Sequence, residues 1–251
     1  MTDLRDPKPA FGLGEVLRIS APASLTMLTR TLMRFVDGLM VSHVGPEPLA
    51  AQLAAGMTAF AYEAFILGTL TAVNTYVAQN LGAGRHRRCG EYARSGMLLS
   101  LLLSVPALLL MLPAGPLFRL LQQPADLVDL EAMYFRYMVA LIPAAQLAVC
   151  LERFFYGVHR PHVVLAVSLM ANAVNVGANW LLIFGHGGFP ALELEGAAIG
   201  TVCGIFTELL LMGVMFLAPG VHRQFATRRL QASWAQAKDV LRVGWPAGVQ
   251  F

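Results

Sequence analysis

The chain has 251 residues, of which 57% are hydrophobic and 13% are charged. Because the charged share is about half that of a typical soluble domain, the composition excludes an ordinary water-soluble protein and indicates an integral membrane protein. The net charge of +3 does not indicate a nucleic-acid partner, since the basic residues lie scattered between hydrophobic segments. Three widely spaced cysteines indicate neither a disulfide framework nor a zinc site.

Six apolar segments are each long enough to cross the hydrocarbon core of a bilayer as a helix, which takes about 20 residues. Charge-rich stretches separate these segments, and their periodicity is helical. The sequence therefore predicts an all-α integral membrane protein in contact with membrane lipid. The predicted spans are Ile19–Val41, Pro48–Asn80, Ser95–Phe118, Leu127–Gly157, Val163–Phe184 and Gly196–Ala218.

Basic residues concentrate on alternate connectors between the predicted spans. Arg85, Arg87 and Arg88 follow the second span, whereas 42–47 and 185–195 contain no lysine or arginine. By the positive-inside rule, this asymmetry puts the N-terminus in the cytoplasm. We expect a multi-pass protein of the inner or plasma membrane.

The segment EVLRISAPASL at 15–25 closely matches DVLRVGWPAGV at 239–249. Six predicted spans lie between the two copies, so both run in the same direction through the membrane, which predicts parallel repeats. Because the sequence stops inside the second copy, we expect a six-span lobe of a twelve-span transporter, truncated in span seven, whose second lobe belongs to the same polypeptide. The predicted segments are an N-terminal lobe at 1–220, a cytoplasmic linker at 221–238 and the start of the second lobe at 239–251. Chance similarity between the two segments is the alternative.

The first predicted span carries three charged residues, Arg30, Arg34 and Asp37. Facing lipid, they would together cost roughly 8–10 kcal/mol, against about 2–5 kcal/mol returned by the strongly apolar residues of that span. The charged side chains must therefore face protein or water. Their spacings of four and three put them on one stripe of the helix.

The fifth predicted span has a polar stripe at spacings of four, three and four, formed by Ser168, Asn172, Asn175 and Asn179. Asp37, Asn179 and Thr201 lie at similar depths in their spans, so their oxygen atoms can meet around one sodium ion, or Asp37 can carry a proton. An arginine reaching Asp37 would argue against both. A packed polar network that only holds the helices together is the alternative.

A second set of acidic and aromatic residues lies near the predicted middle of the membrane. Glu63 and Glu208 lie roughly 20 Å deep, where transporter substrate sites usually form. Beside Phe60 and Phe65, a buried carboxylate would suit a cationic aromatic compound. Alternatively, each carboxylate is protonated or hydrogen-bonded within a helix contact.

Four stretches, in chain order, resemble motifs of the multidrug and toxic compound extrusion (MATE) family. They are VDGLMVSHVGPEPLAA at 36–51, GTLTAVNTYVAQNLGAGR at 68–85, NVGANWLLIFGHGGFPALELEGAAIGT at 175–201 and GWPAG at 244–248. The resemblance covers nearly the whole chain. It implies a secondary active transporter, with no catalytic activity and no cofactor besides a coupling ion. Such a protein exports amphipathic organic cations or other toxic compounds in exchange for sodium ions or protons, by alternating access.

The resemblance also implies a first-lobe cation site formed by Asp37, Asn175, Asn179 and Thr201, with Tyr137 as a weaker match nearby. Some members carry an aspartate at the position of Asn179, so this chain offers a cation less negative charge. Two alternatives remain. A lipid-linked oligosaccharide flippase of the same superfamily would use a strongly cationic cavity, to which Arg30 and Arg34 would belong, and an integral-membrane enzyme would need clustered His, Asp or Glu residues at a membrane face.

Overall fold

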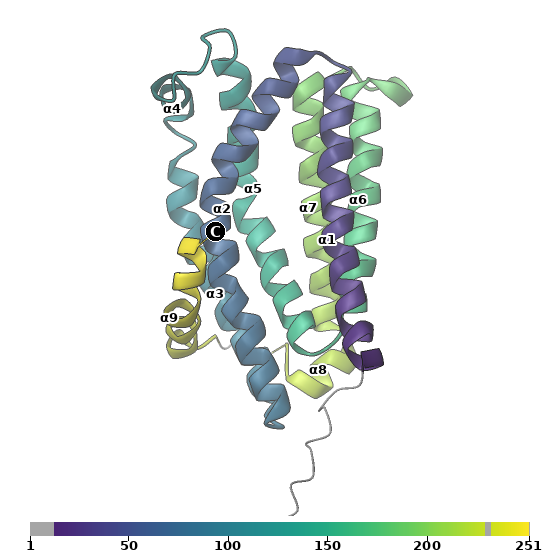
Figure 1. Cartoon of the computed structure of the whole chain (residues 1–251), viewed down its shortest axis with the longest axis vertical. Coiled ribbons are helices and arrows are strands. Elements are labelled where there is room, and N and C mark those ends of the chain that lie inside the picture. Colours follow the sequence, from purple (N-terminus) through teal and green to yellow (C-terminus); the bar gives the residue numbers. More distant parts are fainter. Residues whose placement is uncertain (1–12, 229–231, 251) are drawn as a thin grey trace, which may run out of the picture.

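The computed structural model describes residues 13–228 and 232–250, and the regular elements within these ranges are all helices. Six long helices form a bundle (Figure 1). They are α1 (Leu13–Ser42), α2 (Pro46–Gly82), α3 (His86–Leu109), α5 (Val128–Gly157), α6 (Pro161–Ile183) and α7 (Glu193–Leu217). The shorter elements are α4 (Ala114–Leu120), η1 (His186–Gly188), α8 (Pro219–Phe225) and α9 (Trp234–Gln250). The prediction of an all-α fold is thus confirmed.

Five of the six long helices are long and apolar enough to cross a membrane, namely α2, α3, α5, α6 and α7. Helix α1 has 30 residues, which is ample for a span, but it does not reach the same hydropathy because Arg30, Arg34 and Asp37 lie within it. Its charged face therefore depends on contacts with protein or water, as the sequence predicts.

The predicted third span, Ser95–Phe118, is wrong at both ends. The helix starts earlier, at His86, and ends at Leu109, while Phe118 belongs to the separate helix α4. The apolar run continues beyond Leu109, so hydropathy gives no sign of the break. Pro113 immediately precedes α4, and a proline, which cannot donate a backbone hydrogen bond, suits the start of a new helix better than the interior of an old one.

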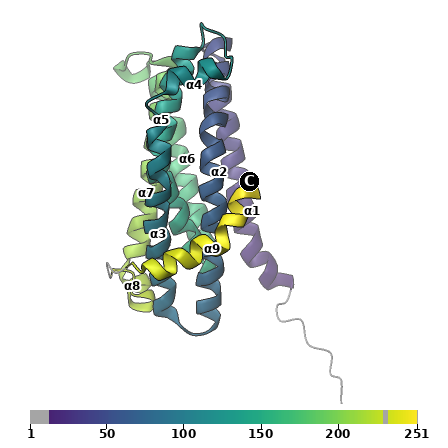
Figure 2. The same cartoon turned by 90° about the vertical axis from the view of Figure 1, so that its left-hand side faces the viewer.

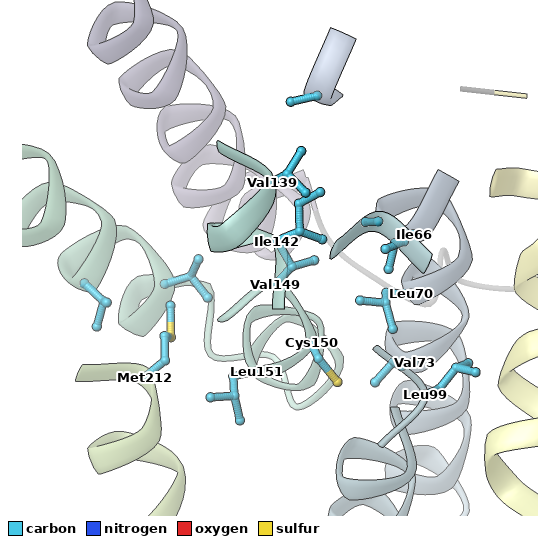
Figure 3. Packing of buried hydrophobic residues seen from close by; sticks show 14 of the residues in the cluster. Ile66, Leu70, Val73, Leu99, Val139, Ile142, Val149, Cys150, Leu151 and Met212 are labelled. Atoms are coloured by element: carbon cyan, nitrogen blue, oxygen red, sulfur yellow. The ribbon is translucent and has the colours of Figure 1, made fainter. Parts of the chain in front are cut away.

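Helix α5 is the central element of the bundle. It packs against α2 and α3 on one side and against α7 on the other, α6 covers α7, and α1 packs mainly on α6 (Figures 1 and 2). The core between α2 and α5 is apolar, with Ile66, Leu70 and Val73 facing Val149 and Cys150 (Figure 3). This arrangement brings polar residues from α1, α5, α6 and α7 into one interior.

Three glycines on one face of α7 bring that helix unusually close to α6. A methyl group at Gly196 would collide with the backbone of Leu182, one at Gly200 with the side chain of Asn179, and one at Gly204 would press on Asn175. Small residues at this spacing let two helix backbones approach closely. The asparagine side chains of α6 therefore lie directly against the α7 backbone.

Helix α9 crosses α2 in a similar way (Figure 2). A methyl group at Gly68 would collide with the backbone of Gly248, and one at Gly244 would collide with the carbonyl of Thr69. Helix α9 starts at Trp234, within the predicted linker at 221–238, and the predicted boundary at 220 falls inside α8. The division into 1–220, 221–238 and 239–251 stays a prediction. Residues 1–12, 229–231 and 251 lie outside the described residues.

Candidate functional site

Asp37 of α1 meets the two asparagines of α6 predicted to accompany it. The Asn179 side-chain amide donates a hydrogen bond to Asp37 Oδ1 at 2.6 Å. The same nitrogen also donates to Asn175 Oδ1 at 3.4 Å. Both asparagine side chains are fully buried. One turn of α6 and one carboxylate of α1 thus form a polar cluster, which we call the Asp37 cluster.

Thr201 joins this group through a residue that the sequence analysis missed. Its hydroxyl donates to the backbone oxygen of Ala197 in its own helix at 3.0 Å and also interacts with the Tyr134 hydroxyl. Tyr134, on α5, lies within electrostatic reach of Asp37 and accepts a 3.5 Å hydrogen bond from the Gln52 side chain of α2. The Asp37 cluster therefore draws on five helices, with Tyr134 and Gln52 as additional members.

Tyr137 is held elsewhere. Its hydroxyl donates to Glu195 Oε1 at 2.7 Å, so it ties α5 to the first turn of α7. Tyr134 and Tyr137 are three positions apart on α5, and only the rotation of α5 against α2 decides which hydroxyl faces Gln52. The sequence weakly indicated Tyr134, because it lies one helical turn from the predicted Tyr137 and shares roughly the same face of the helix.

Several buried polar atoms of the Asp37 cluster have no hydrogen-bond partner among the described residues. They are Asn175 Nδ2, Asn179 Oδ1 and Gln52 Oε1. In the arrangement seen, Asn179 turns its NH₂ group toward Asp37 and donates to that carboxylate. A half-turn of the Asn179 amide would instead present Oδ1 toward Asp37, so that the cluster could offer carboxylate and amide oxygens to a hard cation such as sodium.

Arg30 does not neutralise Asp37. Its Nη2 lies 2.6 Å from Glu152 Oε1 of α5 and 2.6 Å from Glu208 Oε1 of α7. Tyr156 of α5 and Thr26 of α1 add a hydrogen bond beside this pair of ion contacts. We call Arg30, Glu152 and Glu208 the Arg30 cluster. Glu152 was not predicted as a site residue, although it is the acidic residue nearest the end of the fourth predicted span.

Arg34 likewise turns to groups other than Asp37. Its guanidinium carbon lies 5.4 Å from the centre of the Phe60 ring of α2, and its charge acts on Glu63. Phe65 lies against α9 instead, where its ring contacts the position of Gly248. Phe60 and Glu63 are therefore brought together, whereas Phe65 is on another face and Glu208 belongs to the Arg30 cluster.

The sequence left open whether Arg30 or Arg34 pairs with Asp37. Among the described residues, no ion pair joins Asp37 to either arginine, and each arginine contacts acidic or aromatic groups on other helices. The recorded hydrogen-bond partner of Asp37 is the neutral amide of Asn179. Within the part of the chain that the structure describes, the Asp37 carboxylate thus has no positive side chain paired with it.

An open groove of about 660 Å³ runs between α1 and α6. Its lining is largely apolar and includes Leu32, Met33, Val36, Val176 and Trp180. Asn172 lines the same groove and donates a 3.4 Å hydrogen bond to the backbone oxygen of Thr29. The groove provides a mainly apolar surface, and no charged side chain of the described residues lines it.

Comparison with known proteins agrees with this geometry. The MatE family profile matches residues 22–181. The chain is 31% identical over 246 residues to a probable multidrug resistance protein NorM of Synechococcus, covering 94% of this chain and 52% of that protein. It is 30% identical over 238 residues to the probable multidrug resistance protein NorM of Neisseria meningitidis serogroup A, covering 93% and 51%.

Solved structures show the same fold. The chain superimposes on a multidrug resistance MATE family transporter in an outward-facing conformation with a TM-score of 0.81 and 25% identity, covering 93% of this chain and 51% of that one. A MOP superfamily transporter from Pyrococcus furiosus gives 0.80 and 24%, again covering 93% and 51%. These matches define a multi-pass membrane protein with the fold of a transporter lobe. The chain belongs to the MatE family, and it spans about half the length of the curated relatives it matches.

Proposed function

We propose that this chain is the first lobe of a multidrug exporter that expels amphipathic organic cations in exchange for sodium ions or protons. The observation that carries the proposal is the Asp37 carboxylate, which is half-buried where α1 packs on α6 and is bonded to a neutral amide rather than to an arginine. Inside a membrane, a carboxylate of this kind gains from taking up a cation, because it is otherwise a charge in a poorly polar environment.

Ion uptake at the Asp37 cluster would act on α1. The cluster is one of several polar attachments of α1 to the bundle, and it ties that helix to α6. A proton or sodium ion on Asp37 removes or redirects the hydrogen bond from Asn179. The position of α1 then depends on ion occupancy, which is what alternating access between two lobes requires.

The remaining parts of the proposal concern orientation and the second lobe. The end at which α1 starts carries Arg85, Arg88 and Arg160 and is assigned to the cytoplasm of the inner or plasma membrane. The matching segments at 15–25 and 239–249 support a second, parallel lobe in the same polypeptide. The apolar groove between α1 and α6 supplies a surface for the non-polar part of an amphipathic substrate.

The flippase alternative is weakened by the arginines that suggested it. Arg30 contacts two carboxylates, and Arg34 lies over the Phe60 ring with its charge acting on Glu63, so acidic or aromatic groups offset both positive charges. An oligosaccharide diphosphate carrier would need an unbalanced positive charge in its interior. We therefore favour export of organic cations.

Asp37→Asn in the full-length protein, including any sequence beyond residue 251, tests the proposal. We expect the loss of cation-driven efflux of a fluorescent organic cation from reconstituted vesicles, because the neutral amide cannot take up a proton and offers a sodium ion no negative charge. The matched control is Glu47→Gln, which neutralises an exposed acid at the start of α2 and should leave efflux unchanged. Undiminished efflux by Asp37→Asn would show that Asp37 is only structural.

A further inference from the structure

The Arg30 cluster is built around one nitrogen atom. Arg30 Nη2 donates to Glu152 Oε1 and to Glu208 Oε1, at 2.6 Å in each case. The three side chains come from α1, α5 and α7, which are distant in sequence. Two carboxylates thus converge on a single cationic nitrogen, and each uses one of its N–H groups.

The two acids and the arginine are buried to different degrees. The side chains of Glu152 and Glu208 are 3% and 16% exposed, whereas that of Arg30 is 35% exposed. Within the described residues, α1 has no backbone packing against α5 and little against α7. The acids therefore belong to the closely packed part of the bundle, and Arg30 reaches them as a side chain inserted from the more open side.

When both carboxylates are ionised, the electrostatics of the pair favour a cation between them. Two carboxylates held this close in a membrane interior repel each other and are costly to bury unless a positive group lies between them. Arg153 acts on Glu152 from the neighbouring position of α5, but no ion pair joins these two within the described residues. Any group that replaces Arg30 must supply both the charge and the N–H donors.

We propose that Glu152 and Glu208 form a binding site for substrates whose cationic nitrogen carries at least two N–H groups, such as primary ammonium, amidinium and guanidinium compounds, and that Arg30 is its tethered resident. This proposal rests on the proposed function, because the bound compounds are substrates only if the protein exports organic cations. A quaternary ammonium ion lacks N–H groups, so it cannot replace the two hydrogen bonds that Arg30 makes. The site therefore selects protonated amines over permanently alkylated cations.

Displacement of Arg30 would have a mechanical result. Arg30 and Asp37 are seven residues apart on α1, which is about 10 Å along the helix. A substrate that takes over the two carboxylates frees α1 near its middle, while the ion at Asp37 controls its attachment nearer its end. Substrate and coupling ion would thus act on the same helix at two points.

The test is direct binding to the purified full-length protein in detergent, without any ion gradient. Methylguanidinium and tetramethylammonium, added as chlorides at equal ionic strength, are titrated into wild type and Arg30→Ala, with calorimetry and melting temperature as readouts. We expect Arg30→Ala to bind methylguanidinium saturably and at least tenfold more tightly than wild type. Tetramethylammonium should not bind, and the triple variant R30A/E152Q/E208Q should lose methylguanidinium binding.

Two matched variants sharpen the result. Arg34→Ala removes an arginine one turn away that does not contact the acid pair, so it should gain no affinity for methylguanidinium. The double variant R30A/D37N should bind as tightly as Arg30→Ala, because binding here does not involve the coupling ion. A failure of antiport in the Asp37→Asn experiment is therefore distinguishable from a failure of this site.

Equal methylguanidinium affinity in wild type, Arg30→Ala and the triple variant would overturn the proposal, as would equal binding of tetramethylammonium. If Arg30→Ala aggregates during purification, the preparation is repeated with methylguanidinium present, which should restore a folded, monodisperse protein. A variant that stays aggregated in methylguanidinium would count against the site, because the small cation should replace the missing side chain.

Discussion

The Asp37 cluster and the Arg30 cluster lie on the same helix, yet they solve the burial of charge in opposite ways. Asp37 is an acid bonded to a neutral amide, whereas Arg30 is a cation held by two acids. The first arrangement leaves a carboxylate that gains from binding an ion. The second is already charge-paired and resists change until a competing cation arrives. Helix α1 is therefore attached at Asp37 by a contact that we expect to respond to an ion. At Arg30 it is attached by a side chain that is already paired with two acids.

The largest expected difference between the two clusters is in stability. Arg30→Gln leaves two buried carboxylates without their cation and should destabilise the protein by about 3–5 kcal/mol. Asp37→Asn replaces one hydrogen-bond acceptor by another and should change stability by no more than about 1 kcal/mol. Thermal melting of both variants in the same detergent measures the difference. Equal melting temperatures would remove the distinction drawn between the clusters.

A second test concerns the close packing behind the Asp37 cluster. Gly200→Ala puts a methyl group onto Asn179, so we expect destabilisation by about 1–3 kcal/mol and an altered ion dependence of efflux, because Asn179 is pushed from Asp37. Gly213→Ala on the same helix meets nothing within 4 Å and is the matched control. If the two variants behave alike, the position of Asn179 does not depend on Gly200.

The smallest expected effect separates two tyrosines of α5. Tyr134→Phe removes a hydroxyl that joins Thr201 and Gln52 to the Asp37 cluster, and it should cost about 0.5–1.5 kcal/mol while shifting the ion concentration for half-maximal efflux. Tyr137→Phe removes the hydrogen bond to Glu195 at a similar cost in stability and should leave the ion dependence unchanged. A shift in the Tyr137→Phe variant alone would reverse the assignment of these residues.

Much of this arrangement could be predicted from the sequence, because a bilayer leaves few options for polar side chains. The stripe containing Asn175 and Asn179, and the need of Asp37 for a protein neighbour, follow from helical spacing and the cost of charge in lipid. The association of these three residues is present in the structure. Their role in binding an ion stays a prediction.

The contacts that could not be predicted from the sequence depend on how the helices are rotated and tilted against one another. Helical spacing cannot tell whether Tyr134 or Tyr137 faces Gln52, since both lie on neighbouring parts of one surface of α5. Nor can it tell which acid an arginine reaches, and Glu152 lies 122 residues away from Arg30. The end of α3 at Leu109 was missed because apolar residues continue beyond it.

The crossing of α2 and α9 has a consequence for movement. Gly68 and Gly248 put the two backbones in direct contact, with no layer of side chains between them. Sliding along such a contact would drive the neighbouring bulky residues into the backbone, whereas a change of crossing angle leaves the contact point intact. The glycines thus fix the distance between α9 and α2 at this crossing.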